Sequence, residues 1–178
     1  MINTLNLIFV YAVLYGLTQK IADLFNEHGL KWFRGSGLIF GILWGVFGFL
    51  LVLSNNLVAN VILAMNLAYL VRGLLDYPNH QIAATIIFIA FLLFTEFNPF
   101  LFFGFFFIFV IFGKIKDYIS DVLKKKKSLF FIFNYYLIPT FVYSLIVKDW
   151  ILFFVFLLHT LSYESVRFVA KKEGLTNP

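Results

Sequence analysis

Seven apolar segments, separated by short polar connections, constrain the fold of this chain more than any other feature. They cover residues 2–19, 37–54, 56–71, 80–95, 99–113, 128–147 and 149–166. A straight helix needs about 20 apolar residues to cross ~30 Å of hydrocarbon, and aromatic or snorkelling ends can extend the shorter segments. We therefore expect an all-α integral membrane protein with a bundle of about seven transmembrane helices.

The composition agrees with lipid as the solvent of this chain. Only 13% of the residues are charged, whereas a soluble domain has about 25%. We expect residues 1–178 to form one polytopic membrane domain. The first segment lacks the basic start and the small-residue cleavage site of a secretory signal, so we interpret it as a retained span. The chain has no cysteine, which excludes disulfides and thiolate sites.

Lysine and arginine are distributed very unevenly between the two sets of alternating connections. Thirteen of the 14 fall on one side, and only Lys148 falls on the other. The thirteen are Lys20, Lys31, Arg34, Arg72, Lys114, Lys116, Lys124, Lys125, Lys126, Lys127, Arg167, Lys171 and Lys172. The positive-inside rule then predicts an external N-terminus and a cytoplasmic C-terminus in the cell membrane.

Acidic and histidine side chains recur at a spacing of four on the basic side. The three pairs are Asp23 and Glu27, Asp76 and His80, and Asp117 and Asp121. On a helix this spacing puts both members on one face. Mg²⁺ prefers carboxylates, water and substrate phosphates, so we expect Asp76, Asp117 and Asp121 to hold it. The alternative is that each pair is a solvated group at the membrane edge.

The stretch "RGLLDYPNH", residues 72–80, holds an unusual concentration of polar residues between two apolar segments. We expect Asp76 and His80 to be catalytic, with His80 as acid or base because its ordinary pKa is near 6.5. Arg34, Arg72 and Lys114 are the expected phosphate ligands. The leading hypothesis is an integral-membrane enzyme or binder that acts on a phosphate-bearing lipid or isoprenoid at a cytoplasmic-facing site.

Polar residues within the spans support a second hypothesis. Asn66 and His159 lie inside apolar segments, where polar groups are often functional, and we include both among the substrate-binding residues. A small-molecule transporter or a substrate-binding membrane subunit would use such deep residues. A non-catalytic structural subunit of a membrane complex is a third hypothesis. The lysine run 124–127 is expected to contact anionic lipid headgroups, and nothing indicates nucleic-acid binding.

Two further patterns bear on packing. Gly37, Gly41 and Gly45 repeat every four residues, which predicts close approach of a neighbouring helix along one stripe. Pro78 is expected to start the helix that follows the polar stretch, because proline suits the first helical turn.

Overall fold

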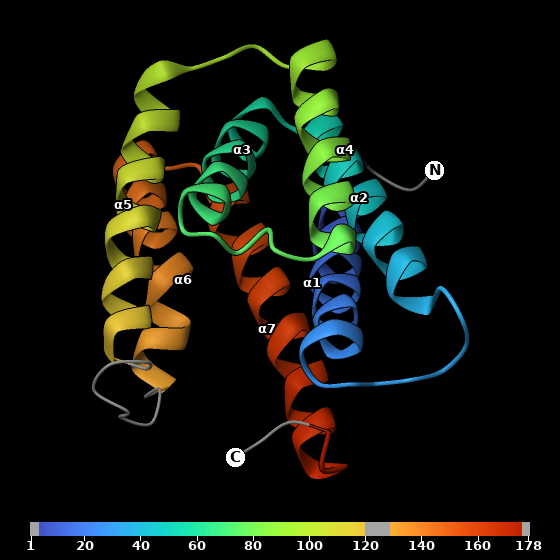
Figure 1. Ribbon diagram of the computed structural model, residues 1–178. Helices are drawn as coiled ribbons and strands as arrows, with labels where there is room; N and C mark the ends of the chain where they lie inside the picture. The colour runs from blue at the N-terminus through green and yellow to red at the C-terminus, as the bar shows by residue number, and fades with distance from the viewer. Residues whose placement is uncertain (1–3, 120–128, 176–178) are drawn as a thin grey trace.

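The computed structural model describes residues 4–119 and 129–175, with the backbone alone at 4–6, 27 and 129–135. The described residues form seven helices and no strand. The helices are α1 (Thr4–Glu27), α2 (Ser36–Ser54), α3 (Asn56–Val71), α4 (Pro78–Phe94), α5 (Pro99–Asp117), α6 (Leu129–Val147) and α7 (Ile151–Lys172). Figure 1 shows that successive helices run in alternating directions along the long axis of the molecule.

Four helices of the described chain are long and apolar enough to cross a membrane. They are α2, α5 and α7 in full, together with Leu7–Asn26 of α1. This agrees with the expected all-helical membrane protein. The helices α3 and α4 have 16 and 17 residues, or about 24–26 Å at 1.5 Å per residue. Because this is less than ~30 Å of hydrocarbon, seven complete spans stay a prediction.

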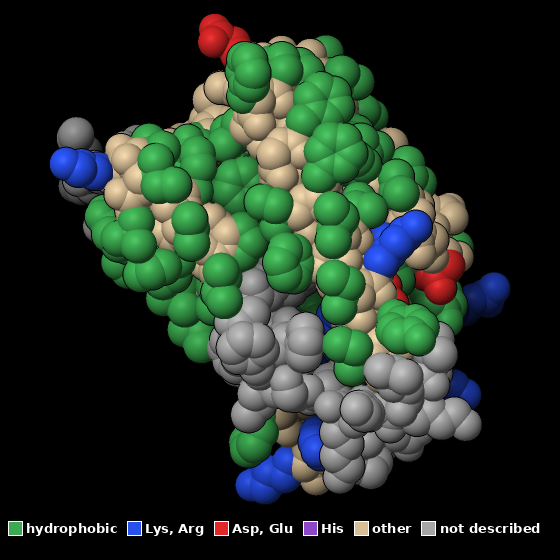
Figure 2. All heavy atoms as spheres, turned by 90° about the vertical axis from the view of Figure 1, so that its left-hand side faces the viewer, with side chains coloured by type: hydrophobic (Ala, Val, Ile, Leu, Met, Phe, Trp, Pro, Cys, Tyr) green, Lys and Arg blue, Asp and Glu red, His purple; other side chains and the backbone are tan. Residues whose placement is uncertain are grey.

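The helices pack unequally. α2 packs mainly on α1 and α4, and α1 packs on α7, while α3 packs on α5. Large side chains such as Tyr15, Trp44, Phe109 and Phe156 fill the interior. Large apolar side chains also cover the outside, and Phe100 on α5 is 94% exposed. Over the coloured part of the face seen in Figure 2, hydrophobic side chains predominate, as a lipid-facing surface requires.

Gly41 and Gly45 of the predicted glycine stripe pack against α4, whereas Gly37 faces Phe25 of α1. A Cβ added to Gly41 would lie 2.6–2.8 Å from the Cβ, carbonyl oxygen and Cα of Asn79. A Cβ on Gly45 would lie 3.1 Å from the Cα of Ala83. Gly41 thus lets α2 touch the first turn of α4, and this contact fixes the depth of His80.

The connection between α3 and α4 lies well inside the length of the molecule. In Figure 1 it lies about midway along the long axis, whereas α1, α5 and α7 continue towards the C-terminal end. Gly73 makes the turn with φ 74, and α4 starts at Pro78 as predicted. The polar stretch 72–80 therefore starts α4 about midway along the molecule, with Gly73, Leu74 and Asp76 exposed and Asn79 and His80 buried.

The opposite end of the bundle is held by asparagines. Asn60, which is fully buried, donates from Nδ2 to the carbonyl of Glu96 at 2.9 Å and accepts from the backbone N–H of Asn98 at 2.8 Å. The backbone N–H of Glu96 donates to Oδ1 of Asn56 at 3.1 Å. These bonds hold the α4–α5 connection against the start of α3. The end of α4 is therefore fixed here, and its start is fixed by the contact with Gly41.

Candidate functional site

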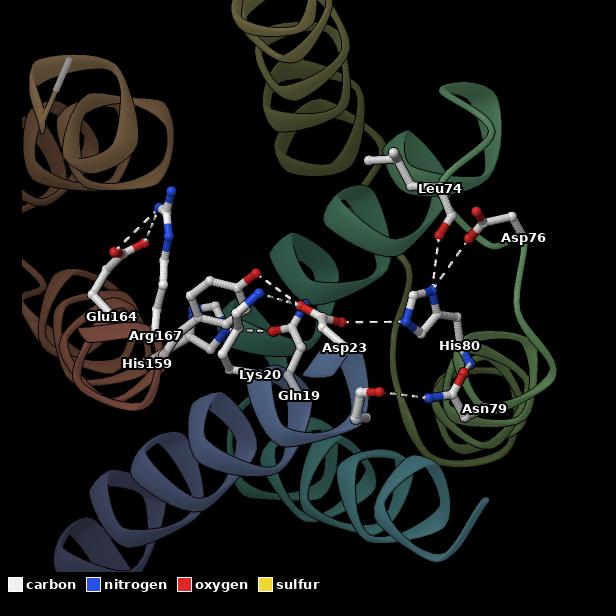
Figure 3. A network of polar contacts seen from close by, with 12 residues as sticks. Gln19, Lys20, Asp23, Leu74, Asp76, Asn79, His80, His159, Glu164 and Arg167 are labelled. Atoms are coloured by element: carbon white, nitrogen blue, oxygen red, sulfur yellow. Dashed lines mark hydrogen bonds and ion pairs between the residues drawn. The ribbon is translucent and has the colours of Figure 1, made fainter. Parts of the chain in front are cut away.

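His80 is the centre of a buried polar cluster near the end of α1. Its Nδ1 lies 3.1 Å from the carbonyl oxygen of Leu74 and 3.5 Å from Oδ1 of Asp76. Its Nε2 lies 3.2 Å from Oδ1 of Asp23, on α1. The His80 side chain is 6% exposed and that of Asp23 is 11% exposed, whereas that of Asp76 is 57% exposed. Figure 3 shows the imidazole between the two carboxylates.

The partners of the His80 ring determine which ring nitrogens need a hydrogen. Carbonyl and ionised carboxylate oxygens can only accept hydrogen bonds, so each ring nitrogen needs a hydrogen to bond its neighbour. The imidazolium form has both hydrogens, and in that form the 3.2 Å contact between Nε2 and Oδ1 of Asp23 is an ion pair. An imidazole beside a carboxylate is an arrangement that general acid–base chemistry uses.

Two further donors converge on Asp23. The Tyr163 hydroxyl, on α7, donates to Oδ2 at 2.8 Å, and Nζ of Lys20 lies 3.5 Å from the same oxygen. The ammonium also lies 5.1 Å from the centre of the Tyr163 ring, within cation–π range. With His80 as imidazolium, two positive and two negative groups balance, namely Lys20 and His80 against Asp23 and Asp76. The balance explains how four charged groups can gather where hydrocarbon is near.

Asn79 anchors this arrangement to the backbone of α1. Its Nδ2 donates to the carbonyl of Ala22 at 3.1 Å. Its Oδ1 accepts from the backbone N–H of His80 at 2.9 Å and from Nδ2 of Asn26 in a short contact. Because Asn79 also lies against Gly41, three helices determine the position of the His80 ring. The site is therefore built into the packing of α1, α2 and α4.

Arg72 makes a separate ion pair across the bundle. Its guanidinium donates to both carboxylate oxygens of Asp117, at 3.0 Å and 2.8 Å, and the Arg72 side chain is 2% exposed. Gly113 makes room for it, because a Cβ there would overlap the guanidinium. Residues 72–80 thus reach α5 through Arg72 and α1 through His80.

A third polar group lies deeper between α1 and α7. Nε2 of His159 lies 2.8 Å from Oε1 of Gln19, and both residues are buried. The hydroxyl of Tyr15 and Oδ1 of Asn66 are buried without a hydrogen-bond partner among the described residues. A cavity of about 10 Å³ beside Tyr15 and His159 is no larger than one water. The deep residues do not enclose a substrate-sized space in this conformation.

The predicted site residues fall into distinct groups. Asp76 and His80 face each other, and Arg72 faces Asp117. Arg34 and Lys114 are exposed. Asn66 and His159 are buried in the bundle, away from the loops.

The expected magnesium site is not formed by the described side chains. No group of three or more metal-ligating residues occurs among them. Asp117 is engaged by Arg72, and Asp76 faces His80. Asp121 lies outside the described residues. A site for Mg²⁺ therefore stays a prediction that depends on Asp121, and we derive no chemistry from it.

Sequence reasoning missed Lys20, Gln19 and Tyr163, and it used Asp23 only as half of a local pair. A signal was present in α1, because Gln19 and Asp23 stand at i, i+4 and Lys20 precedes Asp23 by three. The three polar side chains therefore share one helical face beyond the apolar run. Tyr163 gave no signal, since an aromatic residue within a span is ordinary.

The pKa of His28, just after α1, responds to the same charges. Partial burial lowers its pKa below the ordinary value, as does the charge of Lys20, while Asp23 raises it and Arg167 lowers it. The basic groups of α1 and α7 thus lie near one another at this end of the bundle.

No family model matches the chain, and neither does any curated protein or solved structure with which it was compared.

Proposed function

We propose that this chain is an integral-membrane protein that takes up a phosphate-bearing lipid at its cytoplasmic side and exchanges a proton with it through His80 and Asp23. The observation that carries the proposal is the 3.2 Å contact between Nε2 of His80 and Oδ1 of Asp23, two side chains that are both buried. Ionisable groups buried among apolar helices are costly, and their usual justification is function.

The cations of the cluster supply the proposed phosphate contact. Lys20 and His80 both contact one buried carboxylate, Asp23, while the second carboxylate, on Asp76, is 57% exposed. In the proposal the phosphate takes the place of Asp23 as the partner of Lys20 and of His80 in its imidazolium form. Arg34 and Lys114, exposed at the same predicted membrane side, would attract it.

Each residue has a definite role in the proposal. His80 donates its proton to an oxygen of the bound headgroup, and Asp23 stabilises the imidazolium before the transfer. Asp76 and the carbonyl of Leu74 hold Nδ1, which leaves Nε2 as the exchanging atom. Arg72 is a positioning residue in this proposal, because its guanidinium is already bound to Asp117.

The proposed topology has seven spans, with the N-terminus outside and the C-terminus in the cytoplasm of a cell membrane. Support comes from the thirteen-to-one distribution of lysine and arginine. Because the chain has no cysteine, Glu96→Cys and Lys171→Cys give a clean test with an impermeant thiol reagent on intact cells. We expect labelling at position 96 only. Labelling at position 171 only would mean the reverse orientation.

Ligand binding by the purified full-length chain in detergent tests the function. We would titrate it with dioleoyl phosphatidic acid and, separately, with glycerol 3-phosphate, which is the headgroup without its tails. His80→Asn should weaken both by about tenfold or more, since a bond to a charged group contributes ~1.5–3 kcal/mol. Lys171→Met removes an exposed charge at the same end and should change neither by more than about twofold. Absence of binding by the unmodified chain would refute the proposal.

A transporter is the second candidate, favoured by the buried pair of His159 and Gln19. These residues lie farther into the bundle than Lys20 and Asp23, so a transported solute would pass them. Uptake of a solute into proteoliposomes, abolished by His159→Phe but not by His80→Asn, would support this candidate. If neither variant changes binding or uptake, the chain is better explained as a structural subunit.

A further inference from the structure

An apolar groove lies between α1 and α7. It measures about 300 Å³ and is lined by Phe9, Val10, Val13 and Leu14 of α1 and by Leu158 of α7. The groove opens to the outside of the bundle, where Val10 is 50% exposed. Its size is at the lower end of the range for ligand pockets, and its lining is entirely apolar.

The groove and the polar cluster lie along one face of α1. Val13, Leu17 and Lys20 stand at i, i+4 and i+7, so they share this face. Lys20 is seven residues beyond Val13, or about 10 Å along the axis. The two helices run side by side in the same direction, and α7 contributes the Tyr163 ring that lies against the Lys20 ammonium. An elongated molecule that extends from the groove along α1 would therefore reach the level of Lys20.

The two ends of this path have complementary chemistry. The upper end has only hydrocarbon, and the lower end has the Lys20 ammonium, which is 6% exposed and contacts Asp23, the partner of His80. An amphiphile with a hydrocarbon tail and an anionic head fits both ends, whereas a soluble phosphate fits only one. Gly16 shows that α1 and α7 touch closely just below the groove, because a Cβ there would overlap the carbonyl of His159. The tail must therefore lie on the outer side of this contact and enter from the bilayer.

We propose that the α1–α7 groove holds one acyl or isoprenyl tail of the lipid whose phosphate reaches Lys20, so that the substrate enters sideways from the membrane. This inference rests on the proposed function, since it names the tail site of the same lipid. The groove gains no hydrophobic energy over the bilayer, because lipid tails are equally apolar. Its contribution is to align the headgroup with Lys20 and His80.

Filling the groove tests the proposal. Val13→Trp should weaken binding of dioleoyl phosphatidic acid by about tenfold, which corresponds to 1.4 kcal/mol, and should leave glycerol 3-phosphate within about twofold. Val10→Trp, at a position already half exposed, should act in the same direction if Val13→Trp folds poorly. Ile111→Trp on α5, an exposed apolar position outside the groove, is the matched control and should change neither titration.

The outcomes separate the two proposals. If the chain binds glycerol 3-phosphate but Val10→Trp and Val13→Trp bind the long-chain lipid normally, the groove proposal is wrong and the proposed function survives. If the unmodified chain binds neither ligand, the proposed function fails. A photoreactive benzoylphenylalanine at position 10 gives a second measurement. Crosslinks to phosphatidic acid in vesicles of phosphatidylcholine with a tenth phosphatidic acid should exceed its bulk share, and crosslinks in the bulk ratio would overturn the groove proposal.

Discussion

Gly41→Ala is expected to destabilise the protein and to disturb the site together. The new Cβ would lie 2.6 Å from the Cβ, 2.7 Å from the carbonyl oxygen and 2.8 Å from the Cα of Asn79. Two of these three atoms belong to the backbone, so no side-chain rotation can relieve the overlap. The first turn of α4 must move away from α2, and it carries His80 away from Asp23.

The magnitude follows from the cost of overpacking, which is typically about 1–3 kcal/mol for an added methyl in a close-packed interior. For a chain of this size, 1 kcal/mol shifts the melting temperature by about 2–4 °C. We therefore expect Gly41→Ala to lower the melting temperature by ~2–12 °C. Binding of glycerol 3-phosphate should weaken as well, because Asn79 holds the backbone N–H of His80.

Gly104→Ala is the matched control. Gly104 lies in the exposed face of α5, and a Cβ there meets nothing within 4 Å. Replacing a helical glycine by alanine should stabilise the protein by ~0.5–1 kcal/mol and raise the melting temperature. Thermal unfolding in detergent, followed by intrinsic fluorescence, measures both variants. A melting temperature for Gly41→Ala equal to or above that of the unmodified chain would show that α2 and α4 do not pack as described.

Three further outcomes test other parts of the structure. Asp117→Asn should destabilise the protein by roughly 3 kcal/mol in the same unfolding assay, and by more than Arg72→Met does. The first change weakens the pairing of a buried guanidinium. The second leaves a carboxylate that water can reach. Asn60→Ala should lower stability by about 1–3 kcal/mol and raise hydrogen exchange at the backbone N–H of Asn98, because it removes the acceptor of that hydrogen bond. Stability should decline as the pH falls below ~6.5, because the lowered pKa of His28 means that the unfolded chain binds the proton first, and His28→Asn should reduce this decline.

Local features were predictable from the sequence because helix geometry fixes them. The apolar segments predicted the helices, Pro78 predicted the start of α4, and the spacing of Gly41 and Gly45 predicted a face of close packing. These inferences need only the geometry of one helix and its first turn, and no knowledge of which helix lies opposite. Asp76 and His80 do contact each other at 3.5 Å, but Asp76 lies before α4, so the helical repeat is not the cause of that contact.

Contacts between distant segments were not predictable in the same way. Asp23 and His80 are 57 residues apart, and their contact depends on how α1 and α4 are rotated about their axes. A shift of one residue along a helix turns a side chain by about 100°, so the sequence left many possible partners for each acid. The expected phosphate ligand Arg72 is an example, because its pairing with Asp117 depends on the space that Gly113 leaves in α5.

The shortness of α3 and α4 connects the fold to the proposed function. The two helices are about 4–6 Å shorter than the hydrocarbon thickness, which makes them the weaker candidate spans, but their shortness also places the connection 72–77 about midway along the molecule. One added turn in each helix would move His80 outward by about 5.4 Å, which exceeds its 3.2 Å contact with Asp23. The buried contact between His80 and Asp23 therefore requires short helices at this position, with their far end held by Asn60. A bundle of seven full-length spans would carry the same residues at the membrane surface, where water would separate the imidazole from the carboxylate.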